Sequence, residues 1–164
     1  MDTWAISLEK EYFKFSCAHF LIFPDGSKER LHGHNYSVQV EIEGDLSDHG
    51  LVIDFLDAKP VVRELCDSLD EHWLVAGEHP ELKLEHHADG HSTVVYREFR
   101  YTVPTPEILV LPISNTSVEN LATWFGRELK RRLIDRFGES RVRRLRVAIS
   151  ETPGQRGVYE SRPD

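Results

Sequence analysis

Two runs near the start of the chain alternate apolar and polar residues. The first covers residues 5–20 and the second covers residues 30–43; their alternating apolar positions are Phe13, Phe15 and Cys17, then Tyr36, Val38, Val40 and Ile42. A period of two is typical of a strand with one buried face. A turn cluster over residues 23–27 joins the runs and Gly44-Asp45 closes the second, so the pattern predicts an antiparallel hairpin.

Two later stretches have helical spacing. Asp54 is a suitable cap for a helix ending near residues 69–72, with the apolar stripe Val62, Leu65, Cys66 and Leu69. Because proline lacks an N–H, Pro60 leaves two alternatives: it lies in the first turn, or residues 55–59 form a separate short turn.

The second predicted helix begins at a capping box, Thr116-Ser117-Val118-Glu119, where a carboxylate follows a capping hydroxyl by three residues. Gly138 is a natural stop for it. Its apolar stripe is Val118, Leu121, Ala122, Phe125, Leu129 and Leu133.

Residues 78–106 resemble an inserted hairpin. The turn pair Asp89-Gly90 lies between Leu82-Lys83-Leu84 and an alternating run over residues 93–101, which Pro104 and Pro106 bound. The apolar stretch 108–113 predicts a return strand. A last strand over residues 141–150 would bury Leu145, Val147 and Ile149, with Glu151 continuing the same face, and residues 152–164 read as an irregular tail.

The order strand, strand, helix, hairpin insert, helix, strand predicts an α+β fold with a mostly antiparallel sheet and two helices on one face. At 164 residues, we expect a single domain over residues 1–164. Two helices cover one face of a small sheet, and its edge strands need partners, which self-association would supply.

Composition narrows the class of protein. A net charge of −8 argues against nucleic acid as a partner. We expect no membrane span or signal peptide, because apolar runs near 18 residues and a basic-then-apolar start are missing. Two cysteines, Cys17 and Cys66, make no disulfide framework, so a reducing cytoplasm is the expected location.

The candidate chemistry lies at the strand ends. His32 and His34 are two residues apart and therefore share a strand face, and His19 ends the preceding run. If the strands pair, three imidazoles converge and leave the fourth position of a tetrahedral Zn²⁺ open for a substrate oxygen. The alternative is two strands with polar ends and nothing bound. A second histidine group reads as a solvated loop rather than a second metal site, since its spacing is irregular; its members are His79, His86, His87 and His91.

These landmarks together resemble the 6-pyruvoyltetrahydropterin synthase and 6-carboxytetrahydropterin synthase family. The matching pieces, in order, are Phe15-Ser16-Cys17-Ala18-His19, Leu31-His32-Gly33-His34-Asn35-Tyr36, Gly50-Leu51-Val52-Ile53-Asp54-Phe55, Leu69-Asp70, Ser117-Val118-Glu119-Asn120-Leu121-Ala122 and Ile149-Ser150-Glu151-Thr152. The resemblance implies the tunnelling fold, in which subunits close β-barrels as trimers that stack into hexamers, and active sites at subunit boundaries. It also implies a small-molecule pterin substrate.

The resemblance assigns roles residue by residue. It implies that His19, His32 and His34 are zinc ligands and that Glu151 anchors the pterin, whose 2-amino-pyrimidinone edge offers two parallel N–H groups to a carboxylate. Ser117 matches a position bordering the pterin pocket. The ordinary alternatives are a solvated strand end for Glu151 and a helix cap for Ser117.

The chain departs from the family at its expected base. Most members have a cysteine four residues before the His-Gly-His motif, where this chain has Lys28, and Cys17 matches an alanine instead. Glu29 resembles a variant of the family with glutamate in this place, which cleaves the side chain of 7,8-dihydroneopterin triphosphate to 6-hydroxymethyl-7,8-dihydropterin in folate biosynthesis. A carboxylate in a partly dry pocket is a competent base. The alternative for Glu29 is a solvated loop charge.

A second departure follows the first helix. The family has Asp-His there, whereas this chain has Asp70-Glu71-His72. Either Glu71 shuttles the proton, or His72 reaches the site through an irregular turn. Four arginines near the last strand either bind a triphosphate or, as we favour, lie on its solvated or barrel-facing side; they are Arg141, Arg143, Arg144 and Arg146.

The sequence thus favours a zinc-dependent lyase in which Glu29 removes a proton and a carbon–carbon bond breaks. Two rival functions remain open. One is the ordinary family reaction, giving a 6-pyruvoyl or 6-carboxy product, with Asp70 and His72 active and Glu29 replacing the thiol. The other is a pterin-binding protein that keeps zinc but lacks turnover. A structural oligomer without any ligand is the least specific alternative.

Overall fold

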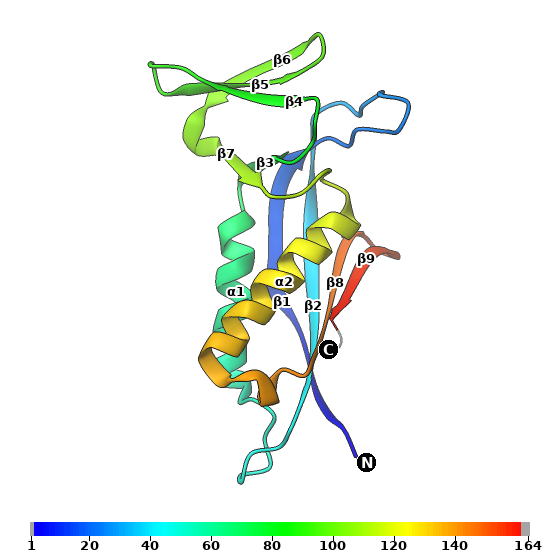
Figure 1. Ribbon diagram of the computed structural model, residues 1–164, viewed down its shortest axis with the longest axis vertical. Helices are drawn as coiled ribbons and strands as arrows, with labels where there is room; N and C mark the ends of the chain where they lie inside the picture. The colour runs from blue at the N-terminus through cyan, green and yellow to red at the C-terminus, as the bar shows by residue number, and fades with distance from the viewer. Residues whose placement is uncertain (1, 162–164) are drawn as a thin grey trace.

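The computed structural model describes residues 2–161, and its centre is one curled six-stranded sheet (Figure 1). The strand order is β7-β3-β1-β2-β8-β9. The bounds are β1 Trp4–His19, β2 His32–Gly44, β3 His72–Ala76, β7 Ile108–Leu111, β8 Arg144–Thr152 and β9 Gln155–Ser161. Helices α1 (Phe55–Leu69) and α2 (Val118–Phe137) cover one face of this sheet, which confirms the predicted α+β class.

The predicted hairpin is confirmed. Strands β1 and β2 pair antiparallel along their length, with an irregularity between Glu9 and Lys14. The register places His19 opposite His32 and Cys17 opposite His34. Paired residues share a sheet face, so the register brings both strand ends to one place on the helix-covered side.

The alternating residues form the main core together with the two helix stripes. Phe13, Phe15, Tyr36 and Ile42 are each at most 1% exposed. The α2 stripe, apart from the partly buried Val118, is fully buried: Leu121, Ala122, Phe125, Leu129 and Leu133. Burial of apolar area on this scale is the main stabilising contribution to such a fold.

Neither predicted position of Pro60 is correct: it lies neither in the first turn of helix α1 nor after a separate short turn. Asp54 caps the helix as predicted, accepting the Leu56 N–H at 2.8 Å. The helix then runs unbroken, with Pro60 in its second turn. Proline has no N–H to donate to the Leu56 carbonyl, so the helix lacks this one backbone hydrogen bond.

Helix α2 begins one residue later than the capping box predicted. Its cap is Ser117, whose Oγ accepts the Asn120 N–H at 3.3 Å, and it ends at Gly138, as expected. The Thr116 hydroxyl, the predicted cap, donates to the Phe20 carbonyl at 2.9 Å instead. Because Thr116 does not cap the helix, its side chain can contact the histidine site.

Two further expectations about strands were wrong, and one strand was missed. The segment described as an irregular tail contains β9, which pairs antiparallel with β8. Strand β3 was not predicted; it pairs in parallel with β1 and β7, whereas the other three strand pairs of the sheet are antiparallel, so the prediction of a mostly antiparallel sheet is confirmed. The run over residues 93–101 is two strands, because Arg97 adopts a left-handed φ of 51° and turns the chain.

The insert therefore forms a separate three-stranded sheet in the order β4-β5-β6. Its strands are β4 Leu82–His86, β5 His91–Tyr96 and β6 Phe99–Pro104, followed by a 3₁₀ turn at Thr105–Glu107. It stands at one end of the molecule (Figure 1) and packs through its own apolar cluster, whose buried members are Phe20, Ile22, Trp73, Val75, Val94 and Tyr96.

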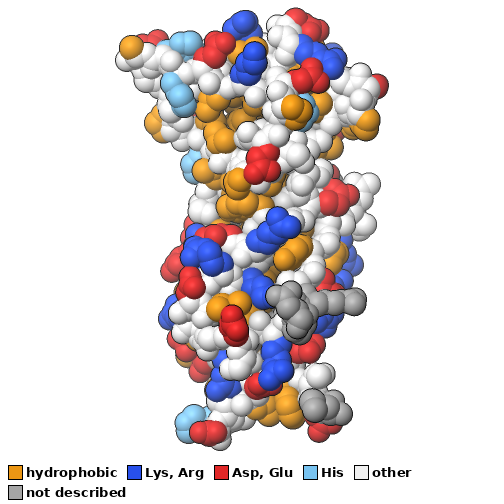
Figure 2. All heavy atoms as spheres, viewed as in Figure 1, with side chains coloured by type: hydrophobic (Ala, Val, Ile, Leu, Met, Phe, Trp, Pro, Cys, Tyr) orange, Lys and Arg blue, Asp and Glu red, His pale blue; other side chains and the backbone are white. Residues whose placement is uncertain are grey.

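Charges are interspersed on the face that Figure 2 shows, with Lys and Arg next to Asp and Glu. Within residues 2–161, no helix combines the length and the apolar character needed to cross a membrane.

Candidate functional site

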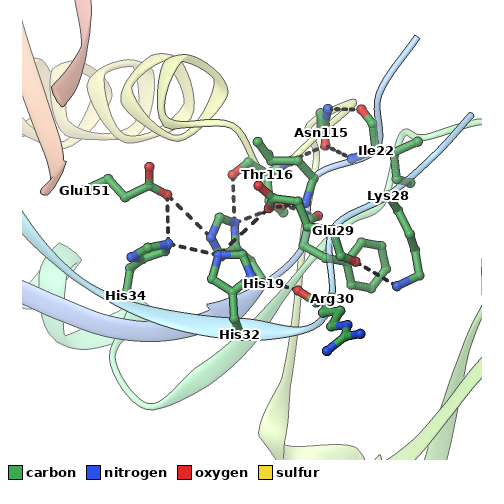
Figure 3. A network of polar contacts seen from close by, with 12 residues as sticks. His19, Ile22, Lys28, Glu29, Arg30, His32, His34, Asn115, Thr116 and Glu151 are labelled. Carbon is green, nitrogen blue, oxygen red and sulfur yellow. Dashed lines mark hydrogen bonds and ion pairs between the residues drawn. The ribbon is translucent and has the colours of Figure 1, made fainter. Parts of the chain in front are cut away.

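Three histidine rings meet where β1 ends and β2 begins. His19 comes from β1, and His32 and His34 from β2, as the period-two pattern predicts. One ring nitrogen from each lies within 4.8 Å of the others. Among residues 2–161 this is the one group of three or more such side chains with metal-ligand spacing. Figure 3 shows the rings facing a common point.

The outer nitrogens of two rings are held by backbone carbonyls. Nδ1 of His32 lies 2.7 Å from the Arg30 carbonyl, and Nδ1 of His19 lies 3.2 Å from the Thr116 carbonyl and 3.3 Å from its hydroxyl oxygen. A carbonyl only accepts, so each Nδ1 carries the proton and each Nε2 presents a lone pair inward. This is the outer-partner arrangement of metal-ligating histidine.

The inward nitrogens fit a divalent cation. Nε2 of His32 lies 2.9 Å from Nε2 of His34, a distance at which two lone pairs repel unless a shared cation or proton lies near them. Burial, and then the neighbouring His32, lowers the pKa of His19, which keeps this ring neutral. Neutral imidazoles are the form that binds metal. The three histidines can therefore hold a metal ion.

A carboxylate closes one side of the cluster. Glu151, in the last part of β8, places Oε1 3.3 Å from Nε2 of His34 and 3.6 Å from Nε2 of His19. The Tyr36 hydroxyl donates to the same oxygen at 3.2 Å. Burial, with nearby Cys17 and Glu151, raises the pKa of Tyr36, so it stays a neutral donor. Glu151 is a quarter exposed, and it is held at the cluster rather than at a solvated strand end.

Glu29 closes the other side of the cluster (Figure 3). Its Oε2 accepts the Leu21 N–H at 3.1 Å and lies 3.9 Å from Nε2 of His32. The Glu29 N–H in turn donates to the Leu21 carbonyl at 3.0 Å. The side chain is thus fixed toward the histidines, in contrast to a mobile loop charge.

Asp70, Glu71 and His72 form the turn from α1 into β3. Asp70 Oδ1 accepts the Ser16 N–H at 2.6 Å, and its carbonyl lies 2.7 Å from Nδ1 of His72. Glu71 adopts a left-handed φ of 57°, uncommon for a residue with a side chain. The chain thus contains the irregular turn that one of the two alternatives required.

Both candidates for the family histidine border one hollow. Glu71 and His72 line a cavity of about 430 Å³ together with Gly33, His34 and Trp73. The cavity reaches a residue of the histidine cluster, His34, and a residue of the insert, Val103. The role of either side chain in proton transfer stays a prediction.

Cys17 is buried beside this site. Burial, with the nearby carboxylates Glu151 and Asp70, raises its pKa to about 12. A thiol with that pKa is protonated near neutral pH and is a poor base or nucleophile. The expectation that Cys17 does not substitute for the missing family thiol is therefore consistent with its surroundings.

The remaining candidates have ordinary partners. Ser117 caps α2, and its place beside a pterin stays a prediction. His86 and His87 bond to the hydroxyls of Ser92 and Thr93, but the expected solvated loop is wrong, since His86 ends β4 and His91 begins β5. Within residues 2–161 this second histidine group does not have metal-ligand spacing. The arginine group makes ion pairs and backbone bonds at the opposite end of β8 from Glu151: Arg144 with Glu41, Glu43 and Glu160, Arg143 with Asp45, and Arg141 with the carbonyls of Asp45 and Leu51.

Sequence reasoning missed two residues of the site. Tyr36 was assigned to the core by its alternation, yet its hydroxyl lies 3.1 Å from Nε2 of His19. Its position two residues after His34 on the same face was the available signal. Thr116 is 97 positions from His19 in the chain, and nothing local indicates the contact.

Comparison with known proteins gives one consistent result. The family model described as 6-pyruvoyl tetrahydropterin synthase matches residues 7–162. A Methanocaldococcus jannaschii protein assigned as a 6-carboxy-5,6,7,8-tetrahydropterin synthase is 33% identical over 147 residues, 89% of this chain and 88% of that protein. The 6-carboxy-5,6,7,8-tetrahydropterin synthase of Bacillus subtilis is 26% identical over 158 residues, 95% and 86% of the two chains.

The solved structures similar to this chain include 6-pyruvoyl tetrahydropterin synthases. The crystal structure of 6-pyruvoyl tetrahydropterin synthase from Plasmodium vivax matches with a TM-score of 0.90 and 27% identity, covering 99% of each chain. Two further structures of the P. vivax enzyme carry alanine or cysteine in place of a glutamate described as a catalytic residue.

Proposed function

The chain belongs to the 6-pyruvoyl tetrahydropterin synthase family, and we propose that it is a zinc-dependent lyase acting on the side chain of 7,8-dihydroneopterin triphosphate. The proposed product is 6-hydroxymethyl-7,8-dihydropterin. One observation carries the proposal: three ligand nitrogens lie within 4.8 Å of one another, with the carboxylate of Glu29 on one side and that of Glu151 on the other.

The two carboxylates have different tasks in this proposal. Glu151 accepts paired N–H bonds from the pterin ring and fixes its orientation, and the Tyr36 hydroxyl holds the carboxylate in place. Glu29 removes a proton from the substrate side chain. Zinc, when bound by His19, His32 and His34, would lower the pKa of the side-chain hydroxyls. The glutamate described as catalytic in the P. vivax enzyme supports a carboxylate base in this family.

Glu71 and His72 are proposed as the proton-transfer group, with Asp70 as its orienting residue. The Asp70 carbonyl already fixes one ring nitrogen of His72, which leaves Nε2 for proton exchange. Ser117 is proposed to border the pterin at the start of α2. These four residues and the substrate need not meet within one chain, because we also propose a homo-oligomer, a trimer or hexamer, with sites at subunit boundaries.

Two other outcomes have support. The names of the M. jannaschii and B. subtilis relatives favour a 6-carboxy product, and that of the P. vivax enzyme a 6-pyruvoyl product. The departure at Lys28 and the extra residue before His72 favour, in turn, a pterin-binding protein without turnover.

Product analysis tests the proposal. Purified protein loaded with zinc is incubated with 7,8-dihydroneopterin triphosphate, and the pterins are identified by chromatography and mass spectrometry. We expect 6-hydroxymethyl-7,8-dihydropterin, lost on zinc chelation and restored by added zinc. A 6-pyruvoyl or 6-carboxy product would overturn the product assignment. Stoichiometric zinc and tight pterin binding without any product would indicate the non-catalytic function.

A further inference from the structure

Lys28 lies among aromatic rings drawn from two parts of the fold. Its Nζ is 4.6 Å from the ring centroid of Phe20, 4.4 Å from that of Phe99 and 5.1 Å from that of Tyr101. Phe20 directly follows β1, whereas Phe99 and Tyr101 belong to β6 of the insert. An ammonium near several ring faces is attracted to each of them, and partial burial strengthens the attraction. We call these three rings the aromatic cage.

Two hydrogen bonds give the ammonium a fixed position. Nζ donates to the Tyr101 hydroxyl at 2.7 Å and to the backbone carbonyl of Glu29 at 2.8 Å. One bond therefore reaches the insert, and the other reaches the residue proposed as the base. In Figure 3 the side chain of Lys28 extends away from the histidines while that of Glu29 extends toward them.

The rest of the segment between β1 and β2 is held at other points. Asn115 bonds to both the N–H and the carbonyl of Ile22, at 3.2 and 2.8 Å. The Tyr96 hydroxyl of the insert donates to the Gly26 carbonyl at 2.8 Å. Lys28 is the contact with the insert that acts directly on the backbone of Glu29.

We propose that Lys28 is a positioning residue: with the aromatic cage, it holds the Glu29 segment against the β4–β6 insert and so fixes the carboxylate beside the metal site. This inference rests on the proposed function only for the role of Glu29. Its physical consequence is large, because an error of about 1 Å in the placement of a reacting group costs about 100-fold in rate. The insert is then part of the catalytic apparatus through its contacts with Lys28.

The test compares Lys28→Met, Lys28→Arg and Tyr101→Phe with the control Lys83→Met. Methionine keeps the length of the side chain but removes its charge, and arginine keeps the charge. Tyr101→Phe keeps the ring and removes the acceptor from the insert side. Lys83 is an exposed residue of β4 in the same insert. Zinc content, hydrogen exchange of the peptide spanning residues 21–30, kcat and KM are measured for each protein.

For Lys28→Met we expect exchange in this peptide at least tenfold faster and kcat at least tenfold lower, with zinc content unchanged and KM within twofold. Tyr101→Phe should move exchange in the same direction by about threefold, and Lys28→Arg should recover most of both quantities. Lys83→Met should match the unaltered protein.

Two results would overturn the proposal. One is exchange in Lys28→Met and Tyr101→Phe that equals exchange in Lys83→Met. The other is faster exchange with an unchanged kcat, which would mean that Lys28 orders the segment but does not position the base. If the unaltered protein forms no pterin product, the proposed function fails, and the exchange measurements still decide whether Lys28 holds the segment.

Discussion

Glu29 is the residue on which the proposed chemistry depends most. Glu29→Gln keeps the size of the side chain and an oxygen able to accept the Leu21 N–H, but it cannot take a proton. We expect kcat to fall by about 10²–10⁴, the usual contribution of a positioned base. Zinc content and the free energy of unfolding should stay the same. Steady-state kinetics, metal analysis and urea unfolding measure these quantities.

A matched control is Glu85→Gln, since Glu85 lies on β4 and its carboxylate faces Arg100 rather than the histidines. It should leave kcat unchanged. Full activity in Glu29→Gln would return Glu29 to a loop charge and move the role of base to the turn at residues 70–72.

The thiol of Cys17 provides a pH test of the same site. With a pKa of about 12, folded Cys17 should be about one-thousandth thiolate at pH 9, and Cys66, whose pKa burial also raises to about 12, should behave alike. Iodoacetamide at pH 9 should label both thiols in urea and neither in the folded protein, as read by mass spectrometry. Because the unfolded thiols release protons first as the pH rises through 9, the folded state should lose stability at higher pH.

Fast labelling of folded Cys17 at pH 8 would contradict this expectation. It would also place a reactive thiol next to Glu151 and reopen the possibility that Cys17 takes part in the chemistry.

At the residue scale, a contact could be predicted from the sequence where its signal is local, and not where it joins residues far apart in the chain. A period of two is local, so the convergence of His32 and His34, and with one assumed pairing of His19, was predictable. The contact of Thr116 with His19 was not predictable, because it depends on where α2 begins and joins residues 97 positions apart. The placement of Lys28 depends in the same way on a β6 strand that the pattern did not separate from β5.

At the scale of elements, α1 contains a proline that lowers the stability of the helix and that a substitution can remove. Pro60 is exposed in the second turn of the helix and leaves the Leu56 carbonyl without its helical donor. Pro60→Ala should restore that bond and raise the free energy of unfolding by about 1–3 kcal/mol. Urea unfolding at pH 7 measures the change. Lys59→Ala, at the preceding and half-buried position, is the control and should change stability by less than about 1 kcal/mol. A loss of stability in Pro60→Ala would mean that the proline fixes the start of the helix.

The elements that sequence analysis missed share a cause. In β3, Trp73 and Val75 face the insert cluster while Leu74 and Ala76 face the main core. A strand buried on both faces shows no alternation, and five residues are too few to separate it from a helix end. Strand β9 is mostly polar and has Gly157 near its centre, so only its pairing with β8 makes it a strand.

At the scale of the whole molecule, neither edge of the six-stranded sheet has a neighbouring strand within residues 2–161. Its outermost strands are β7 and β9, and each presents a valine, Val110 and Val158, that is 45% exposed. Unpaired edge strands favour pairing with another chain. The three histidines proposed as metal ligands all come from one chain, whereas the proposed trimer or hexamer would complete the substrate site between chains. Metal binding and turnover should therefore depend differently on assembly.

Val158→Lys should separate metal binding from turnover. Its side chain lies on an edge strand, opposite the buried Ala148, and a lysine there places a charge against any strand added at this edge. By analytical ultracentrifugation at micromolar concentration, we expect the unaltered protein and the control Val158→Thr to sediment as a trimer or hexamer, and Val158→Lys as a smaller species. The smaller species should keep its zinc, because His19, His32 and His34 remain together, but lose most of its kcat. Full turnover in a monomeric Val158→Lys would contradict sites at subunit boundaries, and a monomeric unaltered protein would contradict the assembly itself.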